Sequence, residues 1–382
     1  MGTDRKPTLG LIVNPVAGLG GRVGLKGSDG TAIQERAIAL GAVSEAHRRT
    51  GAALERLVAR AEGYEIVCAP AEMGEAAAAA VGLTPVVIGS VTRGRTTAAD
   101  TRAAAAGMMR LGVTLLLFAG GDGTARDIAD VVGHDLLVLG IPTGVKMQSG
   151  VFAVSPVAAG EVAAVTLRGG AEGWREAEVM DIDEDALREG IVASRLYGTL
   201  RAPLEPRLVQ GAKCGSRPSD AAAAAGIAEE VARRMEDETL SIVGPGTTTR
   251  AILARLGLEK TLLGVDVVRR GEVVARDVNE ERLLELIKER PARIVVTPIG
   301  GQGCLFGRGN QQISPEVIAR VGRDNLLVAA TPGKLAALEG RSLWVDTGDP
   351  DVDRMLIGYI RVVTGIGVSR ICRVSTGSEQ AA

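Results

Sequence analysis

The sequence predicts an α/β protein with two domains. Three observations support this fold class: short apolar runs alternate with helical, alanine-rich stretches, a glycine turn follows one such run and opens a helix, and the chain of 382 residues is 46% hydrophobic. Strands that alternate with helices imply a parallel sheet with covered faces. A chain of this length and apolar content has room for two or three domains with full cores.

The first domain is expected over residues 1–168. Its strands are predicted at five short apolar runs, residues 9–13, 65–69, 85–88, 113–119 and 136–141. Thr97, with an aspartate three residues later, has the spacing of a capping box, and Ser155, followed by a proline, indicates the start of another helix. The polar glycine cluster at residues 168–173 follows that helix and is the best linker candidate.

A second, mixed β/α domain is expected over residues 174–345. The pattern in residues 178–197 indicates short strands, and Ser219 and Asp220 are expected to cap an alanine-rich helix. Four apolar runs then resume the alternation, at residues 240–243, 262–268, 293–296 and 326–329. Residues 346–382 form a C-terminal segment that could return to the first domain.

Composition argues against several classes of function. The chain has three Phe, three Tyr, two Trp and a formal net charge of −2, so it offers little to stack on bases and no basic surface for nucleic acid. No apolar run approaches the roughly 20 residues of a membrane span, and residues 1–8 are polar, so a cytoplasmic protein is expected. Four scattered cysteines and two histidines indicate no zinc site, no disulfide framework and no Ser-His hydrolase.

The turn Gly-Gly-Asp-Gly-Thr at residues 120–124 is the strongest functional signal. It follows an apolar run and opens a helix, so free backbone N–H groups and the helix dipole favour a phosphate there. A carboxylate in such a turn is repelled by phosphate unless it holds a divalent cation or accepts a proton from an attacking hydroxyl. The turn therefore predicts phosphoryl transfer with Asp122 as the catalytic residue. The alternative is that Asp122 or Thr124 only caps the helix and the glycines only make the turn.

This turn resembles the signature shared by NAD kinases, diacylglycerol kinases and sphingosine kinases and, more distantly, phosphofructokinases. Residues 297–315 are similar to the second NAD kinase signature, Thr-Pro-Thr-Gly-Ser-Thr-Ala-Tyr to Ser-Ala-Gly-Gly-Pro. The agreeing residues are Thr297, Pro298, Gly300, Gly309 and Pro315. Cys304 replaces the tyrosine and Asn310 replaces the second glycine. The chain as a whole is most similar to the longer, divergent ATP-NAD-kinase-like proteins.

The resemblance implies a Rossmann-like N-terminal domain of NAD kinase type and a homo-oligomer. It implies transfer of the γ-phosphoryl group of ATP to the 2'-hydroxyl of the adenosine ribose of NAD, with Mg²⁺ as the divalent cation. Asp122 would be the base or the Mg²⁺ partner. The residues expected around the nucleotide are Asn14, Gly18, Gly20, Lys26, Gly120, Gly121, Gly123, Thr124, Gly144, Thr297, Gly300 and Gly301.

Several alternatives stay open from the sequence. Residues 18–24 have a G-x-G-x-x-x-G spacing that raises a nicotinamide-dehydrogenase interpretation, but no ribose-binding acid ends the next predicted strand. Pro142 matches lipid kinases, where short NAD kinases have asparagine, so the acceptor could be a lipid, a nucleoside or a small metabolite. The protein could also bind a nucleotide as a regulator without catalysis. NAD and NADH as acceptors, and ATP and polyphosphate as donors, are not distinguished.

Two further motifs complete the expectations. Gly-Pro-Gly-Thr-Thr-Thr at residues 244–249 either cradles a second anionic group or simply starts a helix. Asn279 and Glu280 are similar to the Asn-Glu pair that contacts the nucleoside in NAD kinases, but they lie too close to Thr297 for the family order, and Asn279 is expected to cap a helix. Residues 18–30 and 297–315 are expected to meet around residues 120–124, with Lys26 and Arg308 available to balance phosphate charge.

Overall fold

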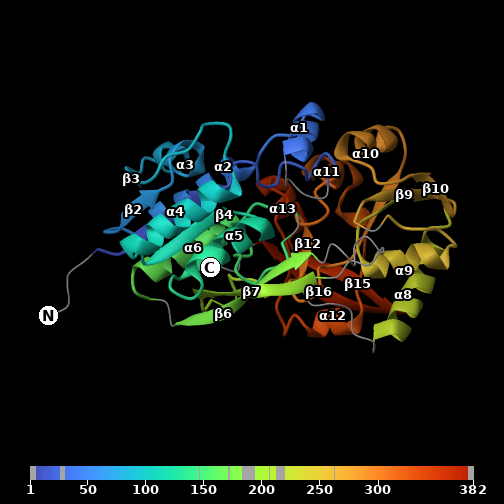
Figure 1. Ribbon diagram of the computed structural model, residues 1–382. Coiled ribbons are helices and arrows are strands. Elements are labelled where there is room, and N and C mark those ends of the chain that lie inside the picture. Colours follow the sequence, from blue (N-terminus) through green and yellow to red (C-terminus); the bar gives the residue numbers. More distant parts are fainter. Residues whose placement is uncertain are drawn as a thin grey trace.

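Two large β-sheets, each with helices packed on it, and one two-stranded sheet make up the described part of the protein. The computed structural model describes residues 6–25, 31–145, 147–170, 173–182, 194–205, 207–211, 220–261 and 263–376. Figure 1 shows the blue-to-green half of the chain beside the orange-to-red half. The α/β class predicted from the alternation of apolar runs and helices is confirmed.

The first sheet has five parallel strands in the order β3-β2-β1-β4-β5. Their bounds are β1 Thr8–Val13, β2 Glu65–Cys68, β3 Val86–Val87, β4 Leu115–Gly120 and β5 Val138–Pro142. The ends of each strand lie within about two residues of a predicted apolar run. Because the strands are parallel, the loops after β1, β4 and β5 leave from the same edge of the sheet, where ligands of open α/β sheets bind.

The strands β1, β4 and β5 are buried along their whole length, which explains why they read as continuous apolar runs, whereas the edge strand β3 is exposed. Leu9 and Leu117 point into one core with α2 (Ala46–Val58) and α6 (Pro156–Leu167). Ile12 and Leu116 point into the opposite core with α4 (Ala98–Leu111) and α5 (Asp122–Val132). Two shorter helices are α1 (Thr31–Ala39) and α3 (Glu75–Ala80).

The predicted helix starts in this domain are present. Thr97 and Asp100 form a reciprocal capping box at the start of α4. The Ser155 hydroxyl accepts a hydrogen bond from the Ala158 amide at 3.1 Å, and Pro156 is the first residue of α6. The strands expected in residues 178–197 are the antiparallel pair β6 (Trp174–Ile182) and β7 (Ser194–Pro203), which packs on α5 and adds Val179 and Leu200 to its core.

The second sheet is mixed and has nine strands in the order β10-β9-β8-β11-β13-β15-β16-β14-β12. Their bounds are β8 Leu240–Val243, β9 Asp266–Arg269, β10 Glu272–Ala275, β11 Ala292–Val296, β12 Cys304–Phe306, β13 Leu326–Ala329, β14 Leu343–Val345, β15 Gly358–Gly365 and β16 Val368–Thr376. One face packs against α8 (Ala221–Arg234) and α9 (Thr247–Arg255). The opposite face packs against α10 (Glu280–Ile287), α11 (Pro315–Val321) and α13 (Pro350–Leu356). The short helix α12 consists of Pro332–Ala336.

The C-terminal segment does not return to the first sheet. Its strands β15 and β16 form a hairpin, and β15 lies parallel to β13. Val362 and Val363 of β15 are buried on opposite faces of the second sheet, which accounts for the pairing. The segment touches the first domain at its start, through Asp346, and the adjoining β12–β14 edge buries Cys304 and Trp344 in the core of α2 and α6.

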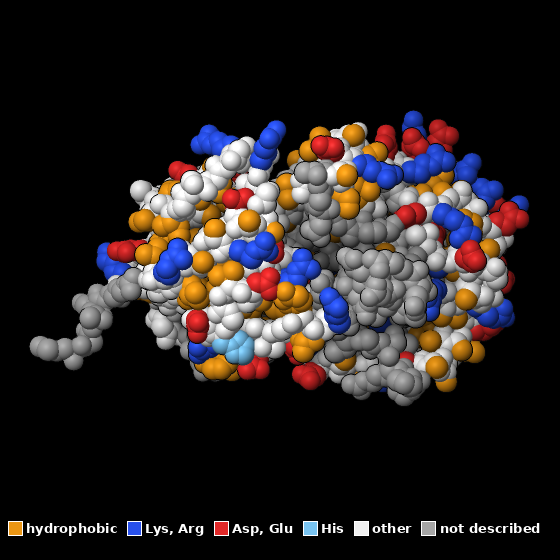
Figure 2. All heavy atoms as spheres, viewed as in Figure 1, with side chains coloured by type: hydrophobic (Ala, Val, Ile, Leu, Met, Phe, Trp, Pro, Cys, Tyr) orange, Lys and Arg blue, Asp and Glu red, His pale blue; other side chains and the backbone are white. Residues whose placement is uncertain are grey.

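The visible surface carries charges of both signs. Figure 2 shows acidic and basic side chains interspersed over the visible face. Within the described part of the chain, no helix has both the length and the apolar character needed to cross a bilayer.

The packing of α2 on α6 predicts opposite effects of one substitution at two glycines. Gly51 of α2 has no neighbour within 4 Å of the position that a Cβ would take, so Gly51→Ala should stabilise the fold by up to about 1 kcal/mol through helix propensity. A Cβ on Gly160 of α6 would lie 2.1 Å from the Ala53 carbonyl oxygen, so Gly160→Ala should destabilise it by about 1–3 kcal/mol. Urea unfolding followed by circular dichroism measures both, and equal stabilities would contradict the close helix contact.

Candidate functional site

The loops after β1 and β4 are joined by Asn14. Its side-chain amide donates to the Thr124 hydroxyl at 3.0 Å, and its backbone amide donates to the Ala119 carbonyl at 2.9 Å. The Asn14 side-chain oxygen accepts from the Val16 amide at 3.2 Å, which shapes the start of the first glycine loop. Asn14 therefore fixes the first loop against the Gly-Gly-Asp-Gly-Thr turn.

Three glycines allow these loops to touch. A Cβ on Gly120 would lie 2.5 Å from the Thr124 hydroxyl, and a Cβ on Gly144 would lie 2.6 Å from the Cα atom of Gly121. Gly18 has a φ of +79°, and a Cβ there would lie 2.3 Å from the Thr143 carbonyl oxygen. No other residue fits these positions without displacing neighbouring atoms, so the turns need glycine for their own packing as well as for any ligand.

Asp122 is the first residue of α5, but its carboxylate reaches beyond the helix. One carboxylate oxygen accepts from the backbone amide of Gln148 at 2.8 Å. The other accepts from the backbone amide of Ser149 at 3.0 Å and from the Ser149 hydroxyl at 2.6 Å. The carboxylate therefore ties the turn after β4 to the segment after β5. This differs from the alternative of a simple helix cap.

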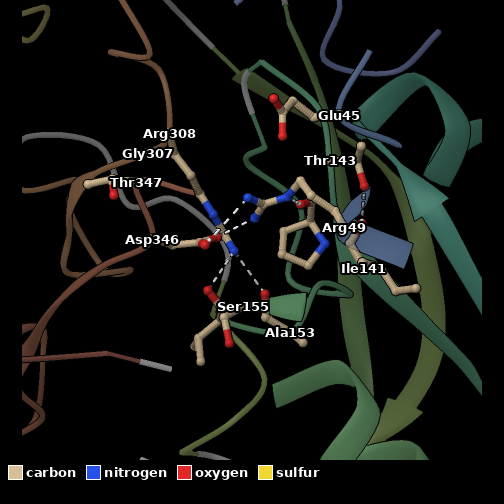
Figure 3. A network of polar contacts seen from close by, with 12 residues as sticks. Glu45, Arg49, Ile141, Thr143, Ala153, Ser155, Gly307, Arg308, Asp346 and Thr347 are labelled. Carbon is tan, nitrogen blue, oxygen red and sulfur yellow. Dashed lines mark hydrogen bonds and ion pairs between the residues drawn. The ribbon is translucent and has the colours of Figure 1, made fainter. Parts of the chain in front are cut away.

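A buried polar chain connects Asp122 with the second domain. The Ser149 carbonyl accepts from the Gln210 side chain at 2.7 Å, and the Gln210 side-chain oxygen accepts from Arg308. Arg308 also donates to the carbonyls of Ala153 and Val154, each at 2.9 Å (Figure 3), and its guanidinium lies 4.5 Å from the ring centre of Trp344.

Arg308 is charged and occupied by protein groups. Burial lowers its pKa to about 10, so the guanidinium keeps its proton at neutral pH. The sequence suggested that this side chain would balance phosphate charge. Its described contacts are instead with Gln210, two carbonyls and an aromatic ring, which fit a role in docking the two domains.

A cavity of about 230 Å³ lies between the two domains, in front of the loop edge. Its first-domain wall is formed by Gly18, Leu19, Gly21, Arg22, Val23, Leu40, Gly41, Ala42, Val43, Glu45, Arg48, Arg49, Pro142, Thr143, Gly144 and Met147. Its second-domain wall is formed by Asn279, Glu280, Glu281, Gly307, Gln311, Ile313, Ser314, Pro315, Asp346 and Thr347. The lining combines apolar side chains with many polar and charged groups, which suits a polar small molecule.

Only part of the predicted set lines this cavity. Among the described residues of that set, Gly18 and Gly144 are in the wall. Those outside the wall are Asn14, Gly20, Gly120, Gly121, Asp122, Gly123, Thr124, Thr297, Gly300 and Gly301. Gly120–Thr124 and Asn14 lie at the same sheet edge, since Gly121 touches Gly144 and Asn14 bonds Thr124. Lys26 lies outside the described residues.

The two outer glycine loops meet through the segment after β5. The Gly309 amide donates to the Val145 carbonyl at 2.9 Å, and the Gln311 side chain donates to the same carbonyl at 3.0 Å. The Gln302 side chain donates to the Met147 carbonyl at 3.0 Å. Residues 297–315 thus contact Val145 and Met147, and the neighbouring Thr143 and Gly144 contact the Gly-Gly-Asp-Gly-Thr turn.

Thr297 belongs to a second cluster, at the carboxyl ends of β8 and β11. The Lys334 ammonium donates to the hydroxyls of Thr297 at 3.0 Å and Thr248 at 3.1 Å. A Cβ on Gly246 would lie 2.6 Å from the Thr297 methyl group. The Gly-Pro-Gly-Thr-Thr-Thr stretch does open α9, as expected, and its threonines are held by protein contacts.

Sequence reasoning missed two groups in the cavity wall. Asn279 caps α10 as predicted, accepting from the Arg282 amide at 3.0 Å, yet Asn279 and Glu280 also line the cavity. Arg49 and Asp346 form an ion pair across the cavity, from opposite domains (Figure 3). These two residues are 297 positions apart, and no local pattern marks such a pair.

Asp353 gives this wall a pH dependence. Its carboxyl accepts from the Thr347 amide at 2.9 Å and hydroxyl at 2.7 Å, and burial raises its pKa from 3.8 to about 6. Between these values the folded state binds the proton more tightly than the unfolded state, so stability falls as pH rises through this window.

Asp353→Asn keeps the acceptor oxygen and should be more stable than the parent at pH 7, by up to about 3 kcal/mol. Melting temperatures from pH 4 to 7.5 test this; an advantage that does not shrink toward pH 4 would contradict it.

Comparison with protein-family models places both domains. Residues 9–171 match the ATP-NAD kinase N-terminal domain, and residues 236–374 match the ATP-NAD kinase C-terminal domain. A search of curated proteins finds no match. The two domain matches span most of the chain, on a fold with the parallel first sheet and the mixed second sheet described above. The chain therefore belongs to the ATP-NAD kinase family.

Proposed function

We propose that the protein transfers the γ-phosphoryl group of ATP to the 2'-hydroxyl of the adenosine ribose of NAD. The observation that carries this proposal is the position of Asp122. Its carboxylate is fixed by three hydrogen bonds in a glycine turn at the ligand-binding edge of the first sheet, and that turn touches the cavity wall at Gly144. Membership of the ATP-NAD kinase family supports the same reaction class.

The glycine turns suit the phosphates of the donor. The first turn of α5 presents backbone N–H groups at the edge of the sheet, and its dipole favours negative charge. Gly18 and Gly144 open the adjoining wall without side chains. The nucleoside would then occupy the cavity, where apolar Leu19, Val23 and Ile313 can contact a base.

Asp122 is positioned to accept a proton. A ribose hydroxyl becomes a competent nucleophile when its proton is accepted in the transition state. As the new O–P bond forms, the bond between the γ-phosphorus and the bridging oxygen breaks, and ADP leaves with that electron pair. The donors from Gln148 and Ser149 hold the carboxylate in one orientation during this step.

Mg²⁺ would be held mainly by the substrate. The described residues contain no cluster of three or more His, Cys, Asp or Glu side chains that forms a metal site. Kinases commonly bind Mg²⁺ through one or two carboxylates together with substrate phosphates, and the carboxylate of Asp122 in the phosphate-binding turn fits this arrangement. The ion would neutralise charge that develops on the phosphoryl group.

The charge of the cavity wall favours a polar acceptor over a lipid. Pro142 is the residue that resembles lipid kinases, but the wall beside it carries Arg49, Glu45 and Asp346. Acyl chains require apolar lining, and burying charged side chains against them is costly. A dinucleotide fits this lining better.

The acceptor is identified by products. The purified protein is incubated with one donor, Mg-ATP or Mg-polyphosphate, and one acceptor at a time. The acceptors are NAD, NADH, adenosine, diacylglycerol and sphingosine, and each mixture is analysed by mass spectrometry. One added phosphate on NAD or NADH is expected. Phosphate on a lipid or on adenosine, with none on either dinucleotide, would reject the proposal.

Asp122→Asn should lower kcat by at least about 10²-fold, because the amide cannot accept the hydroxyl proton. In the variant, an NH₂ group takes the place of one of the two oxygens that accept from the backbone N–H groups of Gln148 and Ser149. Part of the effect can therefore come from a displaced loop.

Ser149→Ala is the matched control for this loop effect. It removes the hydroxyl hydrogen bond to Asp122 but leaves the carboxylate, and we expect a loss of kcat below about 10-fold. Steady-state kinetics on folded variants decide the matter. Turnover near that of the parent in Asp122→Asn would exclude Asp122 as the base.

A further inference from the structure

Arg49 lies on the cavity wall in a fixed orientation. Its side chain is only 10% exposed, and its Nε donates to the Pro142 carbonyl at 2.5 Å, at the carboxyl end of β5. Thr143 and Gly144 follow Pro142 directly and line the same cavity. The guanidinium is therefore held beside the glycine turn to which the donor phosphates are assigned above.

The remaining guanidinium nitrogens bind a carboxylate from the other domain. Both terminal nitrogens face the two oxygens of Asp346, one of them at 3.4 Å, and the Asp346 side chain is also 10% exposed. A planar guanidinium binds phosphate with the same two-point geometry that it uses for a carboxylate. Asp346 thus occupies the position that a phosphate oxygen pair would take.

Several other charged groups near the pair have partners of their own. Glu45 at the cavity rim pairs with Arg48 at 2.5 Å and with Arg22 at 3.8 Å. Arg308 lies beside Asp346 (Figure 3), and its terminal nitrogens donate to Gln210 and to the carbonyls of Ala153 and Val154. Asp353 bonds Thr347. Among the described residues of the cavity wall, Arg49 is the arginine whose ion-pair partner comes from across the cavity.

We propose that Arg49 is a phosphate subsite and that Asp346 occupies it until a nucleotide binds. A phosphate of the nucleotide then replaces Asp346 on the guanidinium, and the ion pair between the domains opens. This rests on the proposed function for the identity of the ligand as a nucleotide. Removing one member of a buried ion pair leaves a buried charge without compensation, and an anion of matching shape relieves it.

The proposal predicts opposite effects of two substitutions on ADP binding. Asp346→Asn removes the competing carboxylate, so ADP should bind about 5- to 10-fold more tightly than to the parent. Arg49→Met removes the subsite, so ADP should bind at least about 10-fold more weakly. Isothermal titration calorimetry with ADP, inorganic pyrophosphate and adenosine measures this. The affinity for pyrophosphate should change in the same direction as the affinity for ADP in each variant. Adenosine should bind all variants with the same affinity.

Arg56→Met is the control on the same helix. Arg56 pairs with Glu161 at 2.6 Å, away from the cavity wall, so its loss should leave the ADP affinity within about twofold of the parent. Arg49→Lys keeps the charge but loses the two-point geometry, and it should weaken ADP binding as well. It replaces Arg49→Met if that variant fails to fold by circular dichroism.

Weaker ADP binding in Asp346→Asn, or unchanged binding in both Arg49 variants, would overturn the proposal. The first result would mean that the pair serves only to hold the domains together, and the second that no phosphate reaches Arg49. These measurements use no acceptor. The subsite can therefore stand if NAD is not phosphorylated, and it can fail while NAD is phosphorylated.

Discussion

The hydrogen bonds from Gln148 and Ser149 to Asp122 hold together the part of the protein on which the site depends. They tie the turn after β4 to residues 143–149, the segment after β5. The second domain contacts this same segment: Gly309 bonds the Val145 carbonyl, and Gln302 bonds the Met147 carbonyl. The short stretch of backbone that orients the carboxylate therefore also takes part in the contact with the second domain.

This arrangement gives the glycines a packing role in addition to the phosphate contact that we propose, and the motif alone does not separate the two. Gly120 and Gly144 are required because side chains there would collide with Thr124 and Gly121. The same absence of side chains leaves backbone N–H groups accessible to phosphate. A substitution at either glycine would disturb the packing of the turn before it could report on a ligand. Side-chain changes in the cavity wall are better probes of binding.

Most of the first sheet could be predicted from the sequence because β1, β4 and β5 are buried throughout and so read as continuous apolar runs. The late strands could not. β12 and β14 have three residues each, and β15 and β16 include exposed apolar residues such as Tyr359 and Ile371. Asp122 was found because a carboxylate in a glycine turn is unusual. Arg49 and Asp346 carry no local signal, since only the docking of the two domains brings them together.

Arg49 and Arg308 are both buried at the interface, but they differ in what they bind. This difference distinguishes an arginine that holds the domains together from one whose partner a ligand can replace. Arg308 donates to neutral oxygens of Gln210, Ala153 and Val154. These groups belong to the folded chain, and we propose no anionic ligand that replaces them. Arg49 binds a carboxylate on the wall of a cavity, where a phosphate can offer the same geometry with more charge. Opening the second contact would leave the first intact. The domains can then stay docked through Arg308 and Trp344 while the cavity wall at Asp346 adjusts to a bound nucleotide.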